Sequence, residues 1–315
     1  MKLQVAKKYW CAGLALAATV QAQSFPSKPI RWIVPFPAGS TVDILARGFA
    51  NAMTPKINQP IVVQNRAGGT MTIAMTALVQ APADGYTLLY TPVTPITIQP
   101  HRMKNLPYTR ESSIAICQNF ENLFWLSVGP KSPYQSYAEL IASAKANPGK
   151  LRYATVGVGS SPHLAGAELW IRNGLQLIDV PYSGEPAYAP HLLTNEVDMG
   201  ISTTTLVVTQ KLRPLAVFAN QRQKAYPNVP TAAELGHPII PSGYGGIFIR
   251  AGTAPAIASR LEDVCRQTTQ EPSYKDITER NFQQADFLDR AAFGARIEAD
   301  FKAKAALIPG LNLPE

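Results

Sequence analysis

The sequence predicts an α/β protein built as two domains or as one bilobed unit, and three observations point to it. With 315 residues the chain is longer than one hydrophobic core usually fills. Short apolar runs alternate with helix-like segments, an order typical of a parallel sheet covered by helices. The same alternation restarts in the second half of the chain. With 46% hydrophobic and 16% charged residues, the composition excludes disorder and coiled coil.

The first half of the chain contains two strand–turn–helix units. Ile30–Val34 is apolar, too short for a helix and ended by Pro35, which is typical of a buried strand. A helix follows from Asp43 to Pro55, after the turn 35–41. The further elements predicted here are strands 61–63, 86–90 and 123–128 and a helix over 70–80.

The second half continues the pattern. Ser136 and Glu139 have the spacing of a capping box, so a helix begins there, and Asn147-Pro148-Gly149 ends it. The glycines of the extended segment 243–249 predict a hinge. We expect two C-terminal helices, one starting at Ala254-Pro255 and one with Phe293, Ile297 and Phe301 on one face. The remaining predictions are strands 152–155, 178–180, 199–201 and 215–218 and a helix over 164–172.

The N-terminus has the pattern of a secretory signal. Lys2, Lys7 and Lys8 precede the apolar run Trp10–Val20, and Val20-Gln21-Ala22 offers the small residues of a cleavage site. We therefore predict a signal peptide over 1–22, which contains Cys11, and a soluble, exported, periplasmic mature protein. No later run approaches the roughly 18 apolar residues that a transmembrane helix needs.

The charge pattern excludes a nucleic-acid partner. Removal of three lysines with the signal lowers the net charge from +8 to +5, and no basic stripe interleaved with aromatic residues remains. Two cysteines are left, Cys117 and Cys265, so a CxxC metal site is excluded. They are either one disulfide or two buried thiols, and their apolar neighbours favour buried thiols.

No motif indicates an enzyme, a cofactor or a metal. The patterns HExxH, GxSxG, GxxxxGK[ST] and SxxK are absent, and Pro162 replaces the third glycine of GxGxxG after Gly157 and Gly159. The four histidines are far apart in the sequence. Ser160 and His163 could be a nucleophile and its base, but residues so placed at a helix start are usually caps. We therefore expect no catalytic residue.

Two loops have the composition of anion sites. Gly39-Ser40-Thr41 and Gly157–Ser161 each combine glycine with hydroxyl side chains ahead of a predicted helix. Backbone N–H groups at helix starts bind carboxylates, and the helix dipole favours negative charge there. Each loop alone is an ordinary capped turn. Together they predict a small anion held between two lobes.

Several blocks of the mature chain resemble one family, the periplasmic solute receptors of tripartite tricarboxylate transporters, also called the Bug receptors. No single block is specific, but they cover nearly the whole chain in family order. The matching blocks are Pro35–Gly39 with Asp43 and Ala46-Arg47, Val63–Arg66, Asp84–Leu89, Leu106–Tyr108, Ala146–Leu151, Tyr153-Ala154 with Gly157, Gly159–Ser161 and His163–Ala165, Val180–Gly184, Leu215–Val217 and Pro227–Thr231.

The resemblance implies a type II periplasmic binding protein, two α/β lobes joined by two crossing strands. Lobe 1 would contain residues 23–125 and 245–315, and lobe 2 residues 126–244. It implies a small carboxylated solute between the lobes, no cofactor, and a monomer that delivers its ligand to the permease subunits of a tripartite transporter. The implied ligand-binding residues are Phe36, Ala38, Gly39, Ser40, Thr41, Asp43, Thr91, Thr94, Gly157, Gly159, Ser160, Ser161, Tyr182 and Ser202. Asp43 is expected to brace its loop.

The chain departs from the family pattern at three places. Ser40 replaces a second glycine, the glycine cluster is thinned to Gly68-Gly69-Thr70-Met71, and Ser202 replaces an aspartate ahead of a shortened segment, 203–211. Without that aspartate a ligand ammonium loses its partner, so a carboxylate without an amino group is favoured. Two alternatives remain open, a sensory receptor that signals to a histidine kinase and a periplasmic hydrolase using Ser160 and His163.

Overall fold

The computed structural model describes residues 25–237, 239, 243–283, 286–311 and 313. The predicted signal peptide and Cys11 lie outside this range. Within it, no helix has the length and apolar character needed to cross a membrane.

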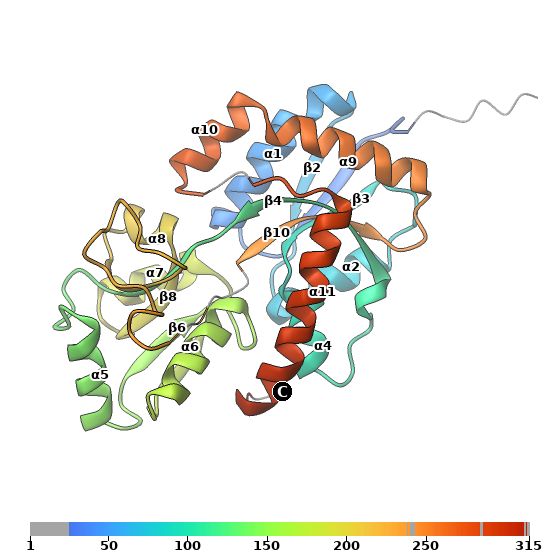
Figure 1. The fold of residues 1–315 in the computed structure, drawn as a ribbon. Coiled ribbons are helices and arrows are strands. Elements are labelled where there is room, and N and C mark those ends of the chain that lie inside the picture. The colour runs from blue at the N-terminus through green and yellow to red at the C-terminus, as the bar shows by residue number, and fades with distance from the viewer. Residues whose placement is uncertain (1–24, 238, 240–242, 284–285, 312, 314–315) are drawn as a thin grey trace, which may run out of the picture.

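The described chain folds around two five-stranded sheets. The first sheet has the order β2-β1-β3-β10-β4 and the second the order β7-β6-β8-β5-β9. We call each sheet with its helices a lobe, lobe 1 and lobe 2 (Figure 1). The strands are β1 (Ile30–Val34), β2 (Ile61–Asn65), β3 (Thr87–Pro92), β4 (Ser113–Glu121), β5 (Phe124–Val128), β6 (Arg152–Thr155), β7 (Ile178–Pro181), β8 (Met199–Thr203), β9 (Arg213–Phe218) and β10 (Tyr244–Arg250).

Helices cover both sheets. Those of lobe 1 are α1 (Thr41–Ile57), α2 (Thr72–Val79), α3 (Thr94–Thr97), α4 (Gln99–Arg102), α9 (Pro255–Thr269), α10 (Pro272–Arg280) and α11 (Arg290–Leu307), with 3₁₀ turns η1 (Gly69–Met71), η2 (Arg110–Ser112) and η3 (Ile308–Leu311). Those of lobe 2 are α5 (Tyr137–Ala146), α6 (Ser161–Arg172), α7 (Glu185–Leu193) and α8 (Thr204–Thr209). Local capping explains where several begin, since the side chains of Ser40, Ser136 and Ser160 cap α1, α5 and α6.

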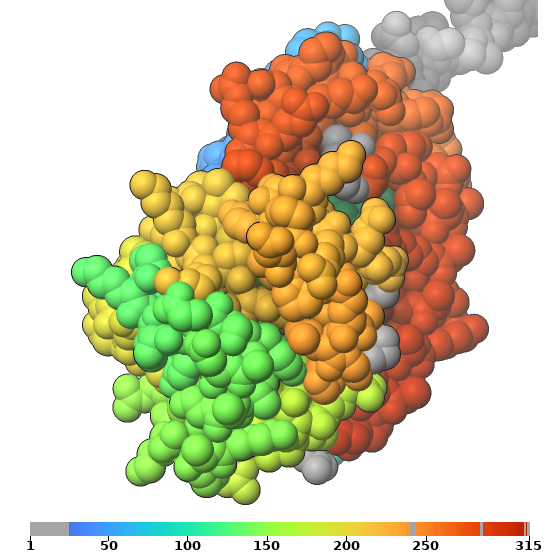
Figure 2. Space-filling model, turned by 60° about the vertical axis from the view of Figure 1, so that its left-hand side comes forward, coloured from blue at the N-terminus to red at the C-terminus, as the bar shows by residue number. Residues whose placement is uncertain are grey.

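The chain passes between the lobes twice. It leaves lobe 1 after β4, enters lobe 2 at β5, and returns from β9 to β10. The two passages lie side by side, because the N–H of Asn122 donates to the carbonyl of Gly243 at 3.0 Å. On the face shown in Figure 2, lobe 2, green to gold, lies directly against the orange and red parts of lobe 1.

A small apolar cluster joins the lobes away from the crossing strands. Leu164 of α6 packs with Ile98, Ile308 and Leu311 of lobe 1, and all four side chains are buried. Ile308 and Leu311 belong to the turn η3, which follows α11 near the C-terminus, close to α6 (Figure 1). The end of the chain is therefore part of the contact between the lobes.

The sheets differ from the parallel arrangement predicted above. β10 runs antiparallel to both β3 and β4, and β5 runs antiparallel to both β8 and β9. Both sheets are therefore mixed, and the reversed strands, β5 and β10, are those on which the chain enters a lobe. The prediction of two C-terminal helices missed α10 between α9 and α11.

The glycines predicted as a hinge lie inside the first sheet. Gly245 and Gly246 are buried in β10, which pairs with strands on both sides. A Cβ at Gly246 would stand 1.9 Å from the carbonyl oxygen of Cys117. These glycines therefore allow close strand contact, and the hinge interpretation is wrong for them.

Cys117 and Cys265 form a disulfide, so the interpretation as two free thiols is wrong. Cys117 lies on β4 and Cys265 on α9, which packs against β4 in the core of lobe 1. This packing places their Cα atoms 6.6 Å apart, within bridging range. The 148-residue separation hides this proximity in the sequence, and the closed loop contains the whole of lobe 2.

Candidate ligand-binding cleft

A cavity lies between the two lobes. The free space inside it is about 40 Å³, below the roughly 300 Å³ at which small-molecule sites begin, so the lobes must move apart to admit a ligand. Both lobes supply walls, and α1 and α6 each begin at the cavity. The lining residues are Phe36, Ser40, Thr41, Val42, Met71, Pro92, Thr94, Asn122, Phe124, Val156, Ser161, Pro162, Glu185, Ile201 and Thr203.

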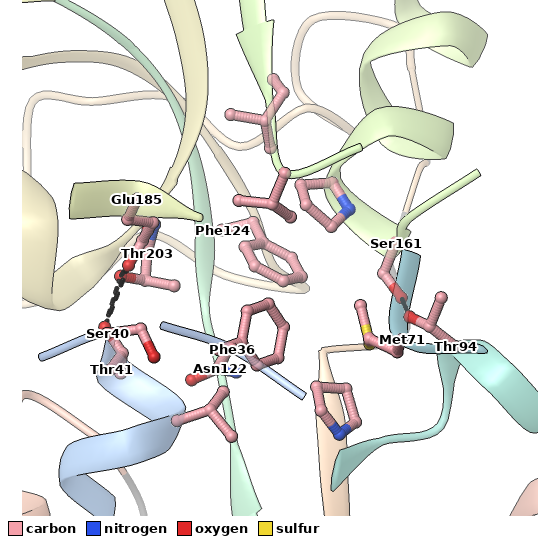
Figure 3. A pocket seen from close by; sticks show the side chains of 15 residues that line it. Phe36, Ser40, Thr41, Met71, Thr94, Asn122, Phe124, Ser161, Glu185 and Thr203 are labelled. Atoms are coloured by element: carbon pink, nitrogen blue, oxygen red, sulfur yellow. Dashed lines mark hydrogen bonds between the residues drawn. The ribbon is translucent and has the colours of Figure 1, made fainter. Parts of the chain in front are cut away.

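The polar side chains gather at two ends of this cavity (Figure 3). One end, which we call the Glu185 pole, consists of Ser40, Thr41, Glu185 and Thr203. The other, the Ser161 pole, consists of Ser161 and Thr94. The rings of Phe36 and Phe124 lie between them (Figure 3). The chemistry of this lining therefore suits a ligand with an apolar body and a polar group at an end.

Hydrogen bonds between the lobes surround the cavity. At the Ser161 pole the hydroxyls of Thr94 and Ser161 are 3.2 Å apart, one from each lobe. At the Glu185 pole the hydroxyl of Thr41 donates across the lobe boundary to the carboxyl of Glu185 at 3.0 Å. Two further bonds, from the hydroxyl of Thr70 to the carbonyl of Val158 (3.0 Å) and from the amide of Gln99 to the carbonyl of Gly159 (3.2 Å), join the lobes nearby.

Among the described residues that line the cavity, the acidic one is Glu185, and it is buried. Its Oε1 accepts from the backbone N–H of Thr203 at 2.7 Å. Its Oε2 accepts from the hydroxyls of Thr203 at 2.9 Å and of Thr41 at 3.0 Å, the second of which comes from the opposite lobe. Burial raises the pKa of Glu185 above its usual value, and these hydrogen bonds oppose that rise.

No lysine, arginine or histidine is among the described residues that line the cavity. An anionic ligand would therefore be held by hydroxyls and by first-turn amides of α1, with the dipoles of α1 and α6 favouring negative charge. In α6 the first turn offers fewer amides, because Pro162 has no N–H and that of His163 donates to Ser160. The described residues also contain no cluster of acidic, histidine or cysteine side chains suited to a metal ion.

Asp43 braces the loop ahead of α1. Its carboxylate accepts from the backbone N–H of Gly39 (2.9 Å), the amide of Asn65 (2.7 Å) and the guanidinium of Arg47 (3.0 Å). Burial raises the pKa of Asp43, but the hydrogen bonds from Arg47, Asn65 and Gly39 outweigh it, so that the pKa lies below its usual value. The carboxylate of Asp43 therefore holds the loop ahead of α1 in place without lining the cavity itself.

We expect Asp43→Ala to destabilise the fold by about 2 kcal/mol at neutral pH, because it leaves three partly buried donors without this acceptor. A lowered folded-state pKa gives stability that is present above the unfolded-state pKa and is lost as the pH falls through the folded value. The difference between wild type and variant should therefore shrink below about pH 4. Urea unfolding at about pH 7 and about pH 2.5 measures both.

The control is Asp263→Ala, which removes a carboxylate whose salt bridge with Arg266 is solvent-exposed. Exposed pairs of this kind contribute less than about 1 kcal/mol. Equal losses for both variants would contradict the bracing role of Asp43.

The predicted ligand-binding residues have different positions. Phe36, Ser40, Thr41, Thr94 and Ser161 line the cavity together. Gly157 and Tyr182 line an adjoining interlobe groove, and Gly39 lines a second groove beyond the Glu185 pole.

The other predicted residues do not line the cavity. Ala38 is exposed, and Thr91 bonds to the carbonyl of Pro92. The carbonyl of Gly159 accepts from Gln99. The hydroxyl of Ser202 accepts from Ser127 at 2.8 Å and from Tyr188 at 3.2 Å. Because side chains alternate along a strand, the neighbouring Thr203 faces the cavity instead.

The geometry around His163 gives it a structural role. The hydroxyl of Ser160 accepts from the backbone N–H of His163, as a helix cap does. The Nδ1 of His163 accepts from the N–H of Gly159 at 3.1 Å, and its Nε2 lies 3.2 Å from a carboxylate oxygen of Asp179. Both ring nitrogens are engaged away from Ser160, so the histidine is not placed to act as its base.

Sequence reasoning missed ten lining residues, most of which lie at the ends of elements or in the loops beside them. They are Val42, Met71, Pro92, Asn122, Phe124, Val156, Pro162, Glu185, Ile201 and Thr203. For Glu185 a local signal exists, since it follows the turn Tyr182–Gly184 and is followed by a proline, an order typical of a helix start.

Comparisons with known proteins agree with this architecture. The model of the tripartite tricarboxylate transporter family receptor matches residues 45–312. Protein BugT of Bordetella pertussis is 34% identical over 253 residues, which are 78% of this chain and 78% of BugT. A second protein of the same organism, of the group UPF0065, is 32% identical over 277 residues, 85% of this chain and 84% of that protein.

Solved structures share the fold. The periplasmic binding protein BugD has a TM-score of 0.85 at 24% identity, over 92% of this chain and 99% of BugD. Rpa4515 of R. palustris, solved with adipate, has a TM-score of 0.85 at 23% identity, over 92% and 99%. MatC of Rhodopseudomonas palustris, solved with malate, has a TM-score of 0.84 at 21% identity, over 90% and 100%.

These likenesses confirm the predicted fold of a two-lobed periplasmic binding protein. They also exclude the hydrolase alternative, because the family consists of binding proteins. The chain therefore belongs to the receptor family of the tripartite tricarboxylate transporters and is a binding protein, not an enzyme.

Proposed function

We propose that this protein captures a small carboxylated solute between its lobes and delivers it to the permease subunits of a tripartite transporter. The observation that carries the proposal is the Ser161 pole, where hydroxyls from the two lobes meet 3.2 Å apart at the start of α6. A carboxylate there would accept hydrogen bonds from both lobes at once.

The relatives support both a carboxylate ligand and its delivery to a transporter. Rpa4515 was solved with adipate and MatC with malate, and both have this fold. The family takes its name from the transporter to which its receptors belong. Residues 1–22 have the pattern of a secretory signal, so we expect this receptor to work in the periplasm.

A ligand screen tests the proposal. The protein starting at residue 23 is tested by thermal shift and calorimetry against monocarboxylates, dicarboxylates, amino acids and neutral sugars. A ligand that binds only the folded state stabilises it by about 2.7 kcal/mol at a hundredfold excess over its Kd. Binding confined to sugars, or to none of these compounds, would contradict the proposal.

Ser161→Asp should abolish carboxylate binding, with Kd rising at least about a hundredfold. The new carboxylate would stand at the start of α6 and take the place of the ligand's own negative charge. Calorimetry with the best carboxylate from the screen measures the change.

The matched control is Ser273→Asp, the same substitution in the first turn of α10, at an exposed position outside the cavity. It should bind as the wild type does. A Ser161→Asp protein that is folded and keeps wild-type affinity would place the ligand carboxylate elsewhere.

A further inference from the structure

The carboxyl group of Glu185 occupies a position suited to an anionic ligand. Glu185 is the first residue of α7, and it accepts a hydrogen bond from Thr41, the first residue of α1. Negative charge is favoured at the start of a helix. The protein's own side chain therefore lies where the positive ends of two helices, one from each lobe, come together.

Glu185 also takes up the donors of this pole. The backbone N–H of Thr203 and the hydroxyls of Thr203 and Thr41 all donate to its carboxyl oxygens. A second carboxylate on the ligand would need those donors and would meet Glu185 in their place. The hydroxyl of Ser40 remains, and a single donor is too few for a buried carboxylate.

Acceptors are correspondingly abundant at this side of the cavity. Because the hydroxyl of Thr41 donates to Glu185, its oxygen presents lone pairs. The hydroxyl of Thr203 also donates to Glu185, and its oxygen already accepts from the N–H of Leu206. The side-chain oxygen of Asn122, which also lines the cavity, is buried and has no hydrogen-bond partner among the described residues. A buried acceptor without a protein partner requires a donor, which a water or a ligand can supply, and the place of this one on the cavity wall makes it available to a ligand.

From this geometry we infer that the receptor selects monocarboxylates with an apolar body and a hydrogen-bond donor, a hydroxyl or an ammonium, at the far end. The inference rests on the proposed function and names its ligand class. The carboxylate lies at the Ser161 pole, the body between Phe36 and Phe124, and the donor faces Glu185 and Asn122. Glu185 excludes dicarboxylates.

This changes one expectation drawn from the sequence. Ser202, which stands where relatives were expected to have an aspartate, suggested that a ligand ammonium finds no partner. In the structure the side chain of Ser202 is bonded to Ser127 and Tyr188, and Glu185 supplies a carboxyl group at the cavity. An ammonium therefore has a partner after all.

Matched ligands test the inference. One set keeps a six-carbon chain and varies only its far end: hexanoate, ω-hydroxyhexanoate, ω-aminohexanoate and adipate. A second set does the same on a ring: benzoate, para-hydroxybenzoate, para-aminobenzoate and terephthalate. In the set that binds, the hydroxy or amino acid should bind wild type at least about tenfold more tightly than the dicarboxylate.

Variants of Glu185 test the cause. Glu185→Gln keeps the volume and removes the charge, and Glu185→Ala frees the donors on Thr41 and Thr203. Both should raise the affinity for the dicarboxylate at least about tenfold and reduce the preference for the donor-bearing acid. Glu196→Gln, which removes an exposed carboxylate of lobe 2, should leave the order unchanged.

The outcomes separate the two proposals. If the dicarboxylate binds wild type most tightly, the inference is overturned and the proposed function stands. If Glu185→Gln and Glu185→Ala fold but change no ratio of affinities, Glu185 is not the selecting residue. Should neither variant fold, the ranking by wild type decides alone. If no carboxylate binds, the proposed function fails and the inference with it.

Discussion

Replacing both Cys117 and Cys265 by alanine is expected to lower the free energy of unfolding by about 5 kcal/mol, because the unfolded chain loses a crosslink that closes a loop of nearly half its length. This is a large fraction of the stability of a typical protein. The variant should unfold at a clearly lower urea concentration than wild type. Urea unfolding without reductant measures the difference.

Two controls keep this prediction specific. Both cysteines are fully buried, so a reductant should not reduce the disulfide while the wild-type protein is folded. Thiol titration of the denatured protein that starts at residue 23 should find no free thiol. An alanine pair as stable as wild type, or two titratable thiols, would show that the bridge contributes nothing in solution.

Gly246→Ala is expected to destabilise the protein by about 3 kcal/mol. The added Cβ would stand 1.9 Å from the carbonyl oxygen of Cys117, and a backbone atom held inside a sheet cannot move aside cheaply. β10 and β4 would have to move apart. The segments that cross between the lobes, which follow β4 and precede β10, would be displaced with them. Chemical unfolding and the apparent melting temperature both report the loss.

The comparison variant is Gly294→Ala, the same substitution inside α11. A Cβ there meets nothing within 4 Å, and alanine is preferred to glycine in a helix, so we expect a gain of about 0.5–1 kcal/mol. If both substitutions had the same effect, the close approach of β10 to β4 would not be the cause.

Elements with a strong local signal could be predicted from the sequence. β1 and β6 have the bounds expected from their apolar runs, and Ser136 caps α5 as its spacing indicated. Strand direction could not be predicted in the same way. Whether β5 and β10 run parallel or antiparallel depends on where the chain crosses between lobes, which no local pattern records.

For the cavity too, only residues with a local sequence signal could be predicted. Ser40, Thr41 and Ser161 were predicted because a glycine–hydroxyl turn ahead of a helix is visible in the sequence itself. Glu185 was not predicted, because its place in the cavity depends on a contact with Thr41. That residue lies 144 positions away and contacts Glu185 across the lobe boundary. The disulfide stayed ambiguous for the same physical reason.

The cluster of Leu164 with Ile98, Ile308 and Leu311 has a consequence for affinity. Separating the lobes would expose these apolar side chains to water, at a cost that grows with the area exposed. A receptor's apparent Kd rises as its binding-competent population falls. The C-terminal turn does not line the cavity, yet it favours the arrangement in which the lobes are together. We therefore expect substitutions there to change the receptor's affinity for all its ligands alike and to leave its selectivity intact.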